Sequence, residues 1–155
     1  MLLFLRGSPA VNAVFAEKGI VLPLTSGQTM TEESRLLDGI AAQKSIFGDQ
    51  IDAMRAAAPE NQKNIQDDLS AYRFGDFYTR KFLPIHEREL LTFSILASQG
   101  GCEGQVKAHV GGNATVGNGK EVLLAALTVC LPYIGFPRTL NALSCINEVL
   151  PEAKQ

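Results

Sequence analysis

The stretch that decides how this chain is interpreted is residues 101–109, GCEGQVKAH. At roughly 100° per residue, Cys102, Gln105 and His109 lie within about 60° of one another on one face of a helix. A thiol, an amide and an imidazole on one face are parts of a proton relay. His109 is one of only 2 histidines in the chain, so few residues could replace it in that role.

A second helical run, residues 87–96 (ERELLTFSIL), supplies the carboxylate that a relay needs. Glu89 is followed by nearly continuous apolar residues, so we expect a buried helix in which this carboxylate needs a partner. We predict Glu89, Cys102 and His109 as catalytic residues. Other interpretations stay open for each of them. The helix dipole favours an acid such as Glu89 at a helix start and a histidine such as His109 at a helix end, and Cys102 could be an inert core thiol.

The remaining sequence predicts an all-α, single-domain bundle of about seven helices over residues 28–155. No segment shows sustained strand alternation with hairpin signals. Residues 1–27 are predicted to be an irregular arm, because prolines and glycines interrupt every apolar run there. The predicted helices begin near residues 31, 51, 59, 84, 102, 120 and 138, with the sixth and seventh separated by a kink at 132–137 and the fifth ended by glycines at 111–112.

Composition excludes some classes of function. The net charge is −2 and no basic run exceeds two residues, so the electrostatic footprint of a nucleic-acid-binding protein is missing. Only 19% of residues are charged, which favours self-association as cover for apolar surface. The apolar start, residues 1–5, is too short to span a membrane or to form a signal segment, although a truncated leader is an alternative. We therefore expect no membrane partner.

The three cysteines indicate a reducing compartment. Cys102, Cys130 and Cys145 are odd in number and widely spaced, so they form neither a disulfide framework nor a zinc site. We expect reduced thiols in the cytoplasm, no metal and no cofactor.

Four further residues are candidates for substrate binding. Arg80 and Arg138 could bind a carboxylate through their guanidinium forks, with surface or intersubunit salt bridges as the alternative. Tyr133 could donate a hydrogen bond in a pocket or could simply pack. Gln105 lies on the same face as His109 and would line the site.

Five segments, in order, resemble the carboxymuconolactone decarboxylase family: FGDFYTR (74–80), ERELLT (87–92), QVKAHV (105–110), KEVLL (120–124) and YIGFPRTLNA (133–142). The resemblance covers about residues 74–150. It implies an all-α, alkylhydroperoxidase D-like subunit that assembles into trimers or hexamers. It also implies a role for Glu89 and His109, which match the family's acidic and histidine positions.

The resemblance implies cofactor-free proton-transfer chemistry, a decarboxylation of a small unsaturated carboxylated or lactone substrate. The related peroxidase branch carries Cys-x-x-Cys-x-x-x-His in this helix. Here Cys102 matches the first cysteine, but Gln105 stands at the second, so no dithiol is available at the motif. A thiol peroxidase that uses Cys102 with an external reductant, and a non-catalytic oligomeric binding protein, remain alternatives.

Overall fold

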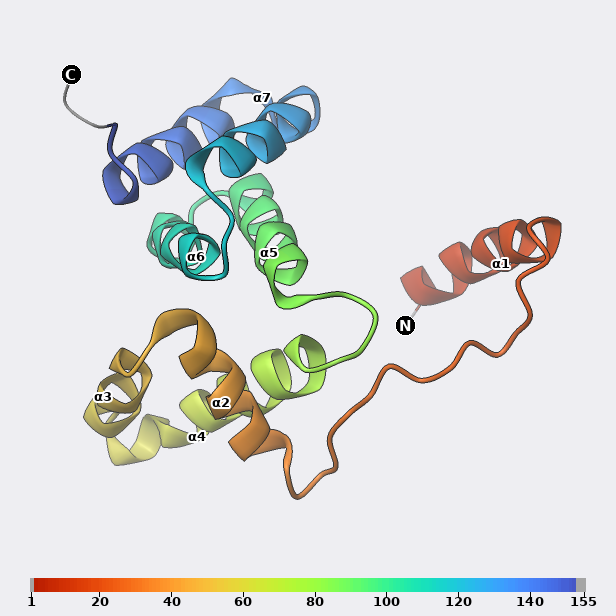
Figure 1. Cartoon of the computed structure of the whole chain (residues 1–155), viewed down its shortest axis with the longest axis horizontal. Helices are drawn as coiled ribbons and strands as arrows, with labels where there is room; N and C mark the ends of the chain where they lie inside the picture. Colours follow the sequence, from red (N-terminus) through yellow and green to blue (C-terminus); the bar gives the residue numbers. More distant parts are fainter. Residues whose placement is uncertain (1, 153–155) are drawn as a thin grey trace.

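The computed structural model describes residues 2–152, with side chains described from residue 9 onward, and every regular element in that range is helical. This confirms the predicted all-α bundle of about seven helices (Figure 1). The α-helices are α1 (Leu2–Glu17), α2 (Arg35–Phe47), α3 (Gln50–Ala57), α4 (Lys63–Asp68), α5 (Ile85–Gln99), α6 (Glu103–Thr115) and α7 (Lys120–Val149). A 3₁₀ turn, η1 (Glu60–Gln62), and a π-helix, η2 (Leu69–Tyr78), complete the set.

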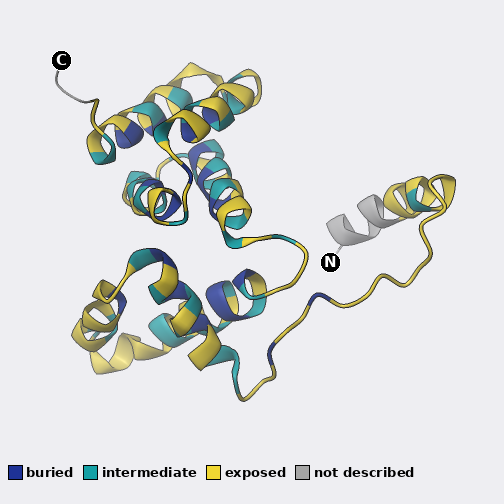
Figure 2. Ribbon diagram, viewed as in Figure 1, coloured by how far each residue is buried: buried dark blue, intermediate teal, exposed yellow. Residues whose placement is uncertain are grey.

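Two apolar clusters form the core. The larger one joins α5, α6 and α7 through fully buried residues such as Phe93, Val110 and Ile146. The smaller one joins α2 and η2 through Ile46, Phe74 and Tyr78. In Figure 2 the buried positions lie on the sides of these helices that face one another. The candidate site described below lies between the two clusters.

The π-helix η2 differs from the single helix that the sequence predicts after Pro59. That segment divides into η1, α4 and η2. Helices α2 and η2 cross closely at two glycines. A Cβ on Gly39 would lie 2.0 Å from the Ser70 carbonyl oxygen, and a Cβ on Gly75 would lie 2.3 Å from the Arg35 carbonyl oxygen. This close approach buries one side of η2, and π-helical turns of this kind occur frequently at functional sites.

The N-terminal arm is more regular than predicted. Residues 2–17 form helix α1 in spite of Pro9, whereas the sequence predicts an irregular arm over residues 1–27 with at most one helical turn. A proline removes one N–H from the helical ladder, and the turns after it keep their own hydrogen bonds. Figure 1 shows α1 apart from the other helices, joined to them by an extended segment.

Helix α6 extends further than predicted. Gly111 and Gly112 do not end it, and the helix continues to Thr115. Glycine weakens a helix interior but does not forbid it, and here Gly112 is buried against α2 and α5. His109 is therefore an interior residue of α6, and not the helix-end residue that one interpretation of the sequence suggests.

Helix α7 is the one helix within the described residues that is long and apolar enough, by length and composition only, to cross a membrane. It is interrupted at Gly135, whose φ of 74° and ψ of 169° are not helical. Figure 1 shows the chain turning back there, so α7 is a hairpin of two arms. Each arm is about 22 Å long at 1.5 Å per residue. Both arms contribute buried residues to the larger cluster, Leu123 and Leu127 from the first and Ala142 and Ile146 from the second.

Candidate functional site

A buried carboxylate–imidazole pair lies at the centre of the molecule. Glu89, on α5, has a fully buried side chain, and its Oε2 lies 2.7 Å from Nδ1 of His109 on α6. The His109 side chain is 13% exposed, and its ring packs edge-on against Phe47, with centroids 5.3 Å apart. Because Nδ1 faces the carboxylate, Nε2 is the nitrogen that remains for a substrate. The structure thus brings together two of the three predicted catalytic residues.

The second oxygen of Glu89 is also occupied. The Tyr78 hydroxyl donates a hydrogen bond of 2.8 Å to Oε1 of Glu89, and it lies 2.5 Å from Oγ1 of Thr92. Burial, and next the negative charge of Glu89, raise the pKa of Tyr78, so this hydroxyl keeps its proton. Both carboxylate oxygens are therefore held by fixed groups, which orients Glu89 toward His109.

The backbones that carry the pair are tied together by Asn113, which is fully buried. Its side-chain amide donates to the carbonyl oxygens of Glu89, at 3.1 Å, and of His109, at 2.7 Å. Asn118 in turn donates to Oδ1 of Asn113 and to the carbonyl of His86, each at 2.8 Å. Gly112 allows α6 to come this close, because a Cβ there would lie 2.9 Å from Oε2 of Glu89.

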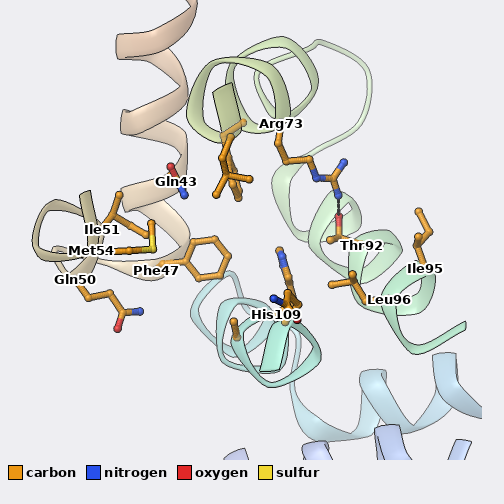
Figure 3. A pocket seen from close by; sticks show the side chains of 14 residues that line it. Gln43, Phe47, Gln50, Ile51, Met54, Arg73, Thr92, Ile95, Leu96 and His109 are labelled. Carbon is orange, nitrogen blue, oxygen red and sulfur yellow. Dashed lines mark hydrogen bonds between the residues drawn. The ribbon is translucent and has the colours of Figure 1, made fainter. Parts of the chain in front are cut away.

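His109 borders a pocket of about 800 Å³ between α2, α3, η2, α5 and α6 (Figure 3). Gln105, one helical turn before His109, lines the same pocket, as predicted from their spacing. The polar lining also includes Gln43, Gln50, Thr92 and Arg73. The rest of the lining is apolar and consists of Phe47, Ile51, Met54, Leu69, Phe74, Ile95, Leu96 and Ala108.

Arg73, on η2, is the permanently charged residue of this lining. Its Nη2 donates a hydrogen bond of 2.7 Å to Oγ1 of Thr92, and its guanidinium carbon lies 5.1 Å from the centroid of the Tyr78 ring. Figure 3 shows the bond between Arg73 and Thr92 at the edge of the pocket. A cationic group thus reaches the pocket from the same short hydrogen-bonded network that holds Glu89.

Cys102 does not lie in this pocket, which corrects the prediction that it lines the site with Gln105 and His109. It is the N-cap residue of α6, with φ −137° and ψ 43°, so its backbone leaves the helical path. Its thiol donates to the Leu96 carbonyl at 3.4 Å. Together with Cys145 and Arg138 it lines a separate void of about 10 Å³. The ideal helical spacing of Cys102 and His109 therefore does not apply, because Cys102 precedes the helix.

The remaining predicted substrate-binding residues also lie away from the pocket of this chain. Tyr133 is 86% exposed at the turn of the α7 hairpin. Arg138 lies against Gly100, where a Cβ would be 3.1 Å from its Nε. Arg80 is exposed, and its carbonyl oxygen accepts a hydrogen bond from Arg88. None of the three is among the residues that line the pocket.

Sequence reasoning missed Arg73, Tyr78, Thr92 and Asn113. Tyr78 was part of a segment that resembles the family, but its contact with Glu89 depends on the π-helix and on Gly75, which no sequence pattern revealed. Thr92 is one turn after Glu89 on α5, and this spacing was the one available signal. Among the residues whose side chains the structure describes, no group of three or more His, Cys, Asp or Glu could hold a metal ion.

Comparison with known proteins agrees with this geometry. The profile of the Carboxymuconolactone decarboxylase family matches residues 64–148, which include η2, α5, α6 and most of α7. The chain is 23% identical over 124 residues to a 4-carboxymuconolactone decarboxylase of Acinetobacter baylyi, an alignment that covers 79% of this chain and 92% of that protein. Since the matched region spans more than half of its length and contains both Glu89 and His109, the chain belongs to the carboxymuconolactone decarboxylase family.

Proposed function

We propose that this chain is a cofactor-free decarboxylase that acts on a small unsaturated carboxylated or lactone substrate. The observation that carries the proposal is the 2.7 Å contact between Oε2 of Glu89 and Nδ1 of His109, at the edge of a pocket large enough for such a substrate. A buried carboxylate of this kind fixes the tautomer and the orientation of the imidazole. The relative from Acinetobacter baylyi is named for the same type of reaction.

The reaction requires one proton delivered to carbon. Loss of CO₂ breaks a carbon–carbon bond and leaves the electron pair delocalised through the conjugated carbonyl of the substrate. His109, as imidazolium, would then give the proton on Nε2 to a carbon that shares this electron pair, either the carbon that lost CO₂ or the carbon next to the conjugated carbonyl. It would keep the proton on Nδ1 toward Glu89, and water would restore the proton on Nε2 before the next turnover. General acid catalysis of this kind contributes about 10²- to 10⁴-fold in rate.

The surroundings of Cys102 do not favour the thiol peroxidase. Its thiol faces the Leu96 carbonyl and a void of about 10 Å³, which is room for about one water molecule. A peroxide substrate needs access to the sulfur atom. The pocket beside His109 is large enough to admit a peroxide, but no thiol is among its lining residues.

The direct test is decarboxylation in D₂O. The protein would be incubated with 4-carboxymuconolactone and with a series of 3-oxo acids, and CO₂ release would be compared with the rate in buffer alone. The proposal expects accelerated release from at least one of these acids, with one deuterium on a product carbon that shared the electron pair left by CO₂, and a large loss of rate in His109→Gln. Release at the buffer rate for every acid would contradict it and would favour the non-catalytic binding protein.

A further inference from the structure

The lining of the pocket beside His109 is more apolar than a multiply charged substrate requires. Of the 14 residues that line it, eight are apolar, among them Phe47, Met54 and Phe74. Arg73 is the single permanently charged residue of that lining, and no lysine or carboxylate accompanies it. A pocket of this composition recognises a ligand mainly through apolar contact, with a few polar groups that fix its orientation.

Arg73 lacks an acidic partner in the described part of the chain. Its contacts there are the Thr92 hydroxyl and the Tyr78 ring, and none of the ion pairs among the described residues includes it. By contrast, Arg35 and Arg55 pair with Asp76 and Asp67. A partly buried guanidinium whose direct contacts are neutral provides a site for one anion, because its fork matches the two oxygens of a carboxylate.

We propose that the pocket binds an acid with one carboxylate and a sizeable hydrocarbon body, with the carboxylate at Arg73 and the hydrocarbon against the apolar lining. A second carboxylate would enter an apolar space with no cation to pair with it, which is unfavourable. This substrate class differs from lactones that carry two carboxylates, and it rests on the proposed function for the identity of the site.

The positions of Arg73 and His109 suit such a ligand. Arg73 contacts Thr92, and His109 contacts Glu89, three residues earlier on α5. Three residues of helix correspond to a rise of about 4.5 Å, so the positions on α5 that Arg73 and His109 contact are about one helical turn apart. In a 3-oxo acid the carboxylate, the carbon to be protonated and the carbonyl oxygen are neighbours. As CO₂ leaves, the single negative charge moves to that carbonyl oxygen and stays near Arg73.

Binding of non-reactive acids tests the proposal without any turnover. Isothermal titration calorimetry would compare hexanoate, octanoate and decanoate with suberate, the dicarboxylate that matches octanoate in length, and with octanamide, its neutral analogue. Affinity should rise up to about fourfold for each added CH₂. Octanoate should bind at least tenfold more tightly than suberate and than octanamide. Equal affinity for octanoate and suberate would overturn the proposal.

Variants assign the carboxylate site. Arg73→Gln should lower the ratio of octanoate to octanamide affinity to near one, and Arg73→Lys should restore part of it. This ratio is measured within one variant, so a change in the folded fraction does not imitate the effect. Arg80→Gln removes an exposed arginine outside the pocket and should leave the ratio unchanged. A ratio that persists in Arg73→Gln would place the carboxylate elsewhere and would contradict the assignment.

Failure of this inference can be told apart from failure of the proposed function. The same titrations in His109→Gln need no chemistry, and the preference for octanoate should persist there. If that preference holds and no acid is decarboxylated by the wild-type protein, the function fails and the ligand class stands. If 4-carboxymuconolactone is turned over and octanoate binds no better than suberate, the ligand class fails and the function stands.

Discussion

The two ends of the Cys102–His109 segment, so close in sequence, have opposite surroundings. His109 faces a pocket of about 800 Å³, and its Nδ1 contacts a buried carboxylate. Cys102 faces a void of about 10 Å³ and a backbone carbonyl. The difference arises because α6 begins at Glu103, so helical spacing holds for Gln105 and His109 and fails for the residue before them. Helical spacing places residues on one face only when all of them belong to the helix.

The largest expected effect is on catalysis, and it comes from substituting the residue at each end of this segment. His109→Gln should lower kcat/KM for decarboxylation by about 10²-fold or more, because it removes the proton donor. Cys102→Ala should change kcat/KM less than twofold, since that thiol is outside the pocket. Steady-state kinetics of CO₂ release on any acid that is turned over would measure both. A large loss in Cys102→Ala with full activity in His109→Gln would reverse the roles of the two ends.

Two glycine substitutions, one near each end of this segment, extend the comparison to the stability of the fold. Gly112→Ala should destabilise the protein by about 1–3 kcal/mol, because the new Cβ would lie 2.8 Å from Cγ2 of Ile46 and 2.9 Å from Oε2 of Glu89. Gly104→Ala, at the Cys102 end, meets nothing within 4 Å and should stabilise α6 by about 0.5 kcal/mol. Urea unfolding of both variants tests this. Equal effects would mean that α6 does not pack closely on Glu89.

The free energy of unfolding should also depend on pH in the alkaline range, because of a buried tyrosine at the pocket end. Burial raises the folded-state pKa of Tyr78 above its ordinary value of 10.0, so the unfolded chain loses this proton first as the pH rises. The free energy of unfolding should therefore fall above about pH 10, by up to about 1.4 kcal/mol per pH unit from this group. Tyr78→Phe should lack this contribution.

Tyr72→Phe is the matched control, because Tyr72 is 61% exposed. It should retain the alkaline loss of stability shown by the wild-type protein. Identical pH profiles for the wild-type protein and Tyr78→Phe between about pH 9 and 11 would contradict the buried position of the Tyr78 hydroxyl.

The smallest effect concerns the thiols at the other end. Cys145 is 2% exposed, and burial raises the pKa of its thiol, so its reactive thiolate is scarce near neutral pH. Alkylation of the native protein with iodoacetamide, followed by peptide mass spectrometry, should modify Cys145 more slowly than Cys102 or Cys130, which are half-buried. Cys145 as the fastest of the three would mean that the α6–α7 contact opens readily.

Much of the fold was predictable because it depends on local patterns. The apolar period of α2 and α5, the proline before α5, and the glycines after α5 and before α7 encode helices and several of their ends. The N-terminal helix and the extension of α6 past Gly111 were not predicted. Their local signals, proline and glycine, weaken a helix without excluding it.

For the site, the sequence by itself determined Glu89, Gln105 and His109, since spacing along a helix and a carboxylate entering an apolar run are properties of short segments. Only the tertiary structure decided the partners of those residues. Tyr78 reaches Glu89 because α2 and η2 cross at Gly39 and Gly75. Arg73 and most of the apolar lining come from η2, α2 and α3, which are separate from the helices α5 and α6 that carry Glu89 and His109. The physical reason is that packing between distant segments sets these distances, and no local pattern records which segments will meet.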